Sequence, residues 1–215
     1  RYVADLDLGD GALHAVFVRS DVAHGTINSI DVSEAAAMPG VVAVWTADEL
    51  GVAPHQAFAA IDPAFARPPL ATDRVRFVGE AVAVVFAETQ AQGVDAAQSV
   101  IADIDPLPSV TDAEAALADD APLLRPERGN NVATAESPDG PLDLDAISEV
   151  VVRGRYVNQR VAVAPMEPHG VAAAPADDGR ITVWISNQFP HYVHGALAGA
   201  TGIPREELHL MTPRV

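Results

Sequence analysis

The sequence predicts an α/β protein with two ordered parts and a long connection between them. In the first half of the chain, short apolar runs bounded by turn residues alternate with segments of helical periodicity. Pro, Asp and Gly recur over residues 103–148, which is typical of a surface connection. Residues 181–211 then have the pattern of a strand, a helix and a second strand. We therefore expect domains over 1–115 and 149–215, with a linker over 116–148.

The first domain is expected to contain strands, short helical turns and one longer helix. Five apolar runs predict the strands, at 13–19, 27–32, 41–45, 75–78 and 81–87. Ser33 is expected to cap a helical turn over 34–38, and a second turn is predicted at 48–50. Thr89 is expected to cap a helix over 90–102, in which apolar residues recur at helical spacing.

The stretches between these elements are less regular. Residues 51–72 are rich in Pro and Ala without periodicity, which predicts a loop. The connection carries one short helical pattern, over 111–118. Order is expected to resume at Glu149, because residues 149–159 alternate like a half-buried strand.

The second domain is predicted to open with a hairpin and to continue into a helix and a strand. Asp177-Asp178-Gly179-Arg180 favours a tight turn between two strands. A helix over 193–200 is expected to end at Gly202, and Pro204 to take the first position of a short turn. The strands are predicted over 170–174, 181–186 and 208–211.

Composition excludes several classes of partner and site. The chain has 30 acidic and 13 basic residues, and Phe77 to Leu124 contains nine acids without one Lys or Arg. A nucleic-acid groove or an anionic membrane surface needs clustered cations, so we expect neither partner. No apolar run approaches the roughly 20 residues that span a bilayer. The absence of Cys excludes disulfides and iron–sulfur ligation within this chain and is compatible with a cytoplasmic location, which we expect.

A few polar residues stand where ligands often bind, although no catalytic motif is complete. Gln188 lies between a predicted strand and helix, so its amide either satisfies helix-start N–H groups or faces a ligand. Glu167, between two prolines, is expected to accept backbone hydrogen bonds, and Glu80 to be solvated in a turn. His191 and His194 share a helical face but lack a third metal ligand, so helix-end hydrogen bonding is the favoured role.

Taken in order, the segments resemble a known family. Residues 13–50 (LHAVFVRSDVAHGTINSIDVSEAAAMPGVVAVWTADEL), 68–89, 94–100 and 107–117 resemble the hammerhead domain of molybdenum hydroxylase large subunits. This family includes xanthine dehydrogenase, aldehyde oxidase and aerobic carbon monoxide dehydrogenase. Residues 155–175 and 181–213, with the MEPHG and NQFPH motifs, resemble the start of its molybdopterin-binding domain. The resemblance implies an α+β hammerhead domain followed by the first part of an α/β cofactor-binding domain.

The resemblance also implies a chemistry. Members hydroxylate a carbon of an aldehyde, an N-heterocycle or carbon monoxide with oxygen from water, using a molybdopterin cofactor, here expected in its cytosine dinucleotide form. Electrons leave through iron–sulfur clusters and FAD, expected on a small and a medium partner subunit of a hetero-oligomer. By position, Gln188 matches the family glutamine whose amide approaches the molybdenum centre. Glu167 matches a recurrent acid given a structural role, and His191 lies close enough to line the same crevice.

The chain departs from the family by what it lacks. The family's Gly-rich GGGFG loop and catalytic glutamate belong to later sequence than Val215. We therefore expect no catalytic residue and no metal ligand in this chain, no tight cofactor binding by it alone, and no activity without the remainder of the large subunit. The alternative is a non-catalytic assembly module that keeps the hammerhead scaffold for subunit contacts.

Overall fold

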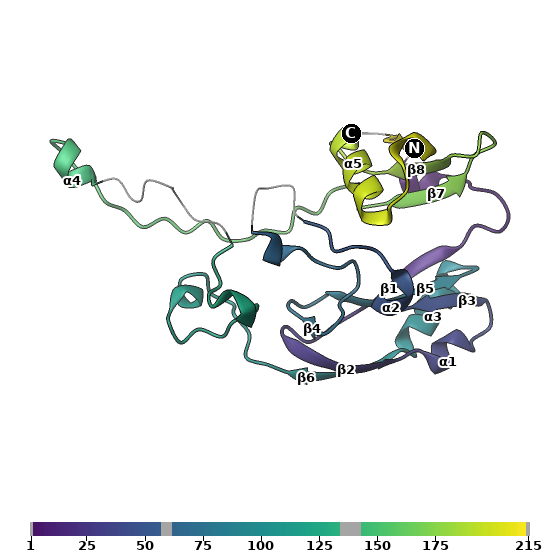
Figure 1. Cartoon of the computed structure of the whole chain (residues 1–215), viewed down its shortest axis with the longest axis horizontal. Helices are drawn as coiled ribbons and strands as arrows, with labels where there is room; N and C mark the ends of the chain where they lie inside the picture. The colour runs from purple at the N-terminus through teal and green to yellow at the C-terminus, as the bar shows by residue number, and fades with distance from the viewer. Residues whose placement is uncertain (1, 57–61, 134–142, 214–215) are drawn as a thin grey trace.

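Two small antiparallel sheets form the first unit of the computed structural model, which describes residues 2–56, 62–133 and 143–213 (Figure 1). Strand β5 (Ala81–Ala87) lies between β1 (His14–Arg19) and β3 (Val41–Trp45) in one sheet. In the other, β2 lies between β4 and β6, which span Gly25–Asp31, Arg74–Val75 and Ile101–Pro106. Three helices complete the unit: the short α1 (Ser33–Ala36) and α2 (Ala47–Leu50), and the longer α3 (Gln90–Gln98).

The core of this unit follows from the apolar run in β5. Val82, Ala83, Val84, Val85 and Ala87 are all at most 3% exposed, so the strand is buried on both faces. On one face, Val85 and Ala87 pack with Ala35 of α1 and Ala96 of α3. Val82 packs instead with apolar residues of the second sheet, which include Ile27 and Ile104. The alternation of the strand therefore holds a helix layer and a second sheet together.

Several predicted elements are confirmed, among them β1, β2, β3, β5 and the turn that forms α2. The Thr89 cap is also confirmed, because its Oγ1 accepts a hydrogen bond from the Gln92 N–H at 3.3 Å. The expected Ser33 cap is wrong, since Val32 holds the cap position without a side-chain bond. The Ser33 hydroxyl and N–H instead bond to Asp31, which holds the pKa of Asp31 below its ordinary value.

The predicted helix over 90–102 is wrong in its last turn. The helix ends at Gln98, and residues from Ile101 form β6, antiparallel to β2. In β6, Ala102 and Ile104 point into the core while Asp103 and Asp105 are exposed, an alternation that only a strand gives. Backbone pairing with β2 therefore outweighs a short helical pattern.

The turn between β4 and β5 contains a buried carboxylate, against the expectation that Glu80 is solvated. Glu80 is 7% exposed, and its Oε2 accepts a hydrogen bond from the Arg76 N–H at 2.5 Å. That N–H is no longer available to continue a strand ladder. Strand β4 accordingly ends at Val75, and the predicted strand over 75–78 is wrong beyond that residue.

The connection is attached to the first unit by aromatic and ionic contacts. The guanidinium carbons of Arg125 and Arg128 each lie 5.4 Å from the centre of the Phe65 ring, and Arg128 pairs with Asp62. Burial, followed by the nearby charge of Arg76, lowers the pKa of Arg125. The predicted helix at 111–118 is reduced to the 3-10 turn η3 (Ala115–Leu117). Three further short elements are η2 (Pro63–Phe65), η4 (Pro126–Arg128) and the one-turn helix α4 (Leu144–Ile147). The expected loop over 51–72 is otherwise irregular, with residues 57–61 outside the described part.

The second unit is a mixed sheet crossed by one helix (Figure 1). The predicted hairpin is confirmed, with β7 (Val171–Pro175) antiparallel to β8 (Ile181–Ile185) across Gly179, whose φ is +83°. Helix α5 (Pro190–Thr201) begins three residues before the predicted start and ends at Gly202, as predicted, with φ +74°. Pro204 directly precedes η5 (Arg205–Glu207) instead of taking its first position, so that prediction is wrong by one residue. Strand β9 (Leu208–Met211) pairs parallel to β8.

The strand predicted over 149–159 is wrong. Among the described residues it has no strand partner, and Val152 and Tyr156 are 90% and 93% exposed. In Figure 1 the chain runs from α4 to the second unit as an extended trace. No helix in the described part of the chain is long and apolar enough to cross a membrane.

Substitution of Gly93 by Ala is expected to lower the free energy of unfolding by about 1–3 kcal/mol through overpacking. A Cβ at Gly93 of α3 would lie 2.7 Å from Val16 Cγ2 of β1, which is too close for two carbon atoms. Gly199→Ala in α5 is the control, because a Cβ there meets nothing within 4 Å and is expected to be neutral or stabilising by up to about 1 kcal/mol. Urea denaturation measures both, and equal stabilities would contradict the described packing of α3 on β1.

Replacement of Glu80 by Ala is expected to cost about 1–3 kcal/mol, because the partly buried Arg76 N–H loses its acceptor. Glu80→Gln retains a side-chain oxygen and is expected to lose clearly less. Thermal denaturation of both variants, with the exposed Glu88→Ala as reference, checks the assignment. A Glu80→Ala variant as stable as Glu88→Ala would mean that the Glu80 carboxylate does not stabilise this turn.

Candidate functional site

The candidate site lies at the carboxyl edge of the parallel strand pair. Strands β8 and β9 run in the same direction, so the residues that follow them meet at one edge of the sheet. Ligands of open α/β sheets characteristically bind at this edge. Residues 186–189 connect β8 to α5 here, and Thr212 and Pro213 follow β9. The sheet therefore presents the Gln188 loop where a ligand of this fold class would lie.

Ser186 fastens two loops together beside Gln188. Its Oγ accepts a hydrogen bond from the Gly170 N–H at 2.7 Å, and the carbonyl oxygens of Gly170, at 3.2 Å, and Pro168, at 3.3 Å, are the acceptors within reach of its O–H. The Ser186 N–H also donates to the Gly170 carbonyl oxygen at 3.0 Å. These bonds hold the loop that precedes β7 against the loop that follows β8. The sequence motifs alone did not single out Ser186, and its position after a buried strand is the one signal that could have done so.

Asn187 shapes the turn that presents Gln188. The Asn187 Oδ1 accepts a hydrogen bond from the Phe189 N–H at 2.5 Å, an Asx turn that fixes the backbone on both sides of Gln188. Gln188 itself is exposed, and within the described part of the chain no hydrogen bond to its side-chain amide is found. The start of α5 has no side-chain cap. The first interpretation of Gln188, in which its amide bonds to N–H groups at the helix start, is therefore not observed.

Glu167 and the two histidines have separate positions around this loop. The Glu167 Oε1 accepts a hydrogen bond from the Val3 N–H at 3.0 Å, so it accepts a backbone bond as expected. This bond holds the turn η1 (Val3–Asp5) against β7, with Val3 only 6% exposed. His191 is exposed in the first turn of α5, beside Gln188 in sequence. The His194 Nε2 lies 3.0 Å from the Arg205 carbonyl oxygen, so His194 has the hydrogen-bonding role expected for it.

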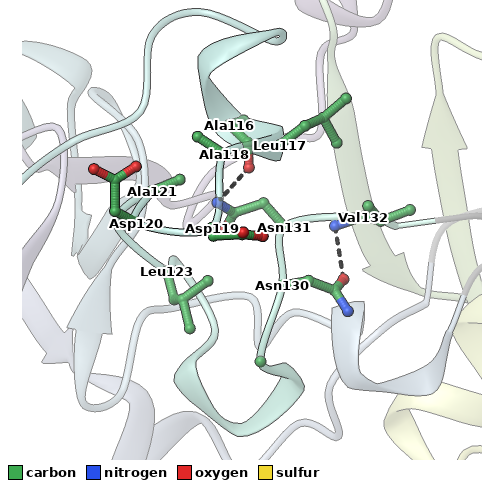
Figure 2. Close-up of a pocket in the computed structure, with 11 residues that line it drawn as sticks. Ala116, Leu117, Ala118, Asp119, Asp120, Ala121, Leu123, Asn130, Asn131 and Val132 are labelled. Carbon is green, nitrogen blue, oxygen red and sulfur yellow. Dashed lines mark hydrogen bonds between the residues drawn. The ribbon is translucent and has the colours of Figure 1, made fainter.

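A cavity of about 290 Å³ lies elsewhere, in the connection between the units (Figure 2). It is lined by residues 116–121, 123 and 129–132, none of which was predicted as a site residue. The Asn131 side chain crosses this region, donating from Nδ2 to the carbonyl oxygens of Ala116 and Pro122. Its Oδ1 accepts from the Leu124 N–H. The cavity therefore lies between loop segments that the Asn131 side chain holds together by hydrogen bonds. We assign no reactive group to it.

The donor set at the Gln188 loop suits a ligand that carries oxygen atoms. A glutamine amide donates hydrogen bonds, and an uncapped helix start favours negative charge. The described residues contain no group of three or more His, Asp or Glu side chains that could hold a metal ion. The loop therefore offers hydrogen-bond donors to a ligand that carries oxygen atoms.

Comparison with known proteins matches both units to families. Residues 1–108 match the a/b hammerhead domain of aldehyde oxidase and xanthine dehydrogenase, and residues 124–215 match the molybdopterin cofactor-binding domain. The chain is 36% identical to the nicotine 6-hydroxylase large subunit of Paenarthrobacter nicotinovorans, over 99% of this chain and 27% of that protein. It is 31% identical to the carbon monoxide dehydrogenase large chain of Afipia carboxidovorans, over 100% and 28%.

The fold is shared with solved structures as well. A crystal structure of Cu,Mo-CO dehydrogenase matches with a TM-score of 0.84 and 31% identity, over 100% of this chain and 29% of that chain. The chain therefore spans less than a third of the length of these relatives. The fold class predicted from the sequence is confirmed: a mixed α+β hammerhead domain, then part of a cofactor-binding domain.

Removal of the Glu167 carboxylate is expected to release the first residues from β7. In Glu167→Ala the Val3 N–H loses its acceptor, so its hydrogen exchange is expected to accelerate on the order of 5-fold, for a bond of about 1 kcal/mol. Glu167→Gln keeps an acceptor oxygen and is expected to stay close to the parent chain. Exchange monitored by NMR or mass spectrometry decides, and unchanged protection of Val3 in both variants would refute the attachment.

Proposed function

We propose, because the chain belongs to the aldehyde oxidase and xanthine dehydrogenase family of molybdenum hydroxylases, that it forms part of the catalytic large subunit of such an enzyme. Family membership rests on the match of a hammerhead domain over half of the chain and of a molybdopterin cofactor-binding domain over most of the remainder. Together with the relatives, these domains make the chain a molybdenum hydroxylase family member. The reaction, the partners and the role of each residue are our proposal.

The observation that carries the proposal is the exposed amide of Gln188 at the carboxyl edge of β8. The Gln188 side chain does not cap α5. The Asx turn at Asn187 and the hydrogen bonds of Ser186 fix the loop that carries Gln188. A fixed loop backbone places Gln188 at this edge before a ligand arrives, which reduces the cost of binding. Gln188 is therefore suited to hydrogen-bond an oxygen atom of a bound cofactor.

A molybdopterin cofactor, when bound, would supply the oxidation of a substrate carbon with oxygen taken from water. Gln188 would donate a hydrogen bond toward the molybdenum centre and orient it, and His191 would line the same crevice. Ser186 and Asn187 would act indirectly by holding the loop in place. We propose the cytosine dinucleotide form of the cofactor. Glu167 would keep its structural role at the edge of the site.

The complete enzyme is proposed to be a cytoplasmic hetero-oligomer, with iron–sulfur clusters and FAD on partner subunits. Relatives are named as a large subunit, a large chain and a subunit gamma, which supports a multi-subunit assembly. Two relatives are named for nicotine and carbon monoxide, and we propose an N-heterocycle, an aldehyde or carbon monoxide as the substrate range. Because Gln188 is the single cofactor contact that we assign, we propose that the 215 residues alone neither bind the cofactor tightly nor turn over.

Substitution of Gln188 by Ala in the assembled enzyme is expected to lower kcat about 10- to 100-fold, the usual effect of removing a group that orients a metal centre. Gln90→Ala at the exposed start of α3 is the matched control and is expected to retain full activity. Steady-state turnover and molybdenum content by elemental analysis are measured on both.

The outcomes separate the two functional classes. Lost turnover in Gln188→Ala, with the subunits still assembled, supports the catalytic subunit. Undiminished turnover in that variant contradicts a cofactor contact by Gln188 and favours the non-catalytic assembly module. A stable, active complex that lacks molybdenum would overturn the assignment to a molybdenum hydroxylase.

A further inference from the structure

Two aromatic side chains follow Gln188 closely, at the start of α5. Phe189 and Tyr192 are 56% and 40% exposed. Aromatic residues make up only 5% of the chain, so two of them within four positions are a local concentration. Residues 189–193 contain no Asp, Glu, Lys or Arg. The end of the helix nearest to Gln188 therefore presents an uncharged aromatic surface.

The choice of Phe at position 189 is not explained by the stability of the helix. Phe189 holds the N-cap position of α5, and no side-chain hydrogen bond caps the helix there. Ser, Thr, Asn and Asp are preferred at an N-cap, because their side chains accept hydrogen bonds from the first N–H groups. More than half of the Phe189 side chain is exposed, so burial in a core does not account for it either. A residue that breaks a local preference without an evident local gain is expected at a functional site.

Helix geometry directs Tyr192 toward the same place. In an α-helix each Cα–Cβ bond tilts toward the N-terminus, and a side chain covers the surface over the turn that precedes its own Cα. For Tyr192 that turn begins at Phe189, directly after Gln188. Residues three positions apart on a helix are also neighbours on its surface, as Phe189 and Tyr192 are. These directions place both rings at the end of α5 that adjoins Gln188 and the carboxyl edge of β8.

An uncharged aromatic surface selects ligands by stacking. Aromatic rings attract one another in offset and edge-to-face arrangements, with a gain beyond the burial of apolar area. Carbon monoxide and a short aliphatic aldehyde have no ring to stack, whereas an N-heterocycle and an aromatic aldehyde do. A substrate has to bring its reacting carbon beside the metal centre that Gln188 is proposed to orient. The ring of such a substrate would therefore lie within reach of Phe189 and Tyr192.

We propose that Phe189 and Tyr192 are specificity-determining residues, an aromatic pair that stacks on a planar aromatic ring of the substrate. This inference rests on the proposed function, since it takes Gln188 as the contact to the cofactor. It narrows the substrate range to compounds with an aromatic ring, either N-heterocycles or aromatic aldehydes. Carbon monoxide and aliphatic aldehydes gain nothing from the aromatic pair.

Steady-state kinetics of the assembled enzyme test the aromatic pair, with quinoline, benzaldehyde, acetaldehyde and carbon monoxide as substrates. The value of kcat/KM for quinoline or benzaldehyde is expected to exceed that for either other compound about 10-fold or more. The better of the two aromatic substrates distinguishes an N-heterocycle from an aromatic aldehyde. A preference for acetaldehyde or carbon monoxide overturns the proposal.

Substitutions assign the preference to the two rings. Phe189→Leu and Tyr192→Leu keep apolar volume without a ring, and each is expected to raise KM for the better aromatic substrate about 2- to 10-fold, with kcat nearly unchanged. Phe189→Tyr and Tyr192→Phe retain a ring and are expected to keep the parent KM. Equal KM values in the Leu variants and the parent enzyme overturn the proposal.

A binding measurement tests the same pair without turnover. Naphthalene, a planar ring with neither a nitrogen atom nor an aldehyde group, is titrated into the assembled enzyme and followed by its fluorescence. Its Kd is expected to rise about 2- to 10-fold in Phe189→Leu and in Tyr192→Leu. Phe77→Leu, at an exposed aromatic residue of the first unit, is the matched control and is expected to leave the Kd unchanged.

Molybdenum content separates the substrate from the cofactor as the bound ring. Elemental analysis is expected to give the same molybdenum content in both Leu variants as in the parent enzyme. A loss of molybdenum from these variants overturns the proposal, because the two rings would then contact the cofactor instead of the substrate. An unchanged naphthalene Kd in both variants overturns it as well.

The aromatic pair and the proposed function fail separately. A molybdenum enzyme that loses turnover in Gln188→Ala but prefers acetaldehyde or carbon monoxide retains the hydroxylase and rejects the aromatic pair. Naphthalene binding that depends on both rings, in an assembled complex without molybdenum, retains the aromatic site and rejects the hydroxylase.

Discussion

Burial of β5 on both faces is the constraint on which the first unit depends. One face of the strand requires the α1 and α3 layer, and the other requires the sheet of β2 and β6. The buried residues of β5 are all Ala or Val, and their short side chains leave room for close approach from both sides. Gly93 of α3 accordingly lies against Val16 of β1 and Ala87 of β5. The connection is then attached to this unit by the Arg contacts on Phe65.

The second unit has no comparable centre. Its buried apolar residues are few, chiefly Val183 of β8, Leu208 of β9 and Val3 from the opening turn. Local hydrogen bonds fix its loops instead, through Ser186, Asn187 and Glu167. The Gln188 loop is therefore positioned by local hydrogen bonds rather than by a packed core.

The sequence predicted those elements whose signals are local. The hairpin across Gly179, the end of α5 at Gly202 and the strand–helix–strand order of the second unit were all correct. The position of Gln188 after β8 followed from the same order, although its cofactor contact remains a proposal. Ser186 was missed because its role consists of bonds to Gly170 and Pro168, 16 and 18 residues earlier in the chain.

The sequence by itself determined the family, the α+β class and most strands, because apolar period and turn residues act over a few neighbours. Tertiary structure alone decided the features that depend on distant partners. Pairing with β2 made Ile101–Pro106 a strand, and the Glu80 carboxylate ended β4 by taking the Arg76 N–H. Conversely, residues 149–159 have the pattern of a strand but no partner within the described chain, and a strand needs a partner to form.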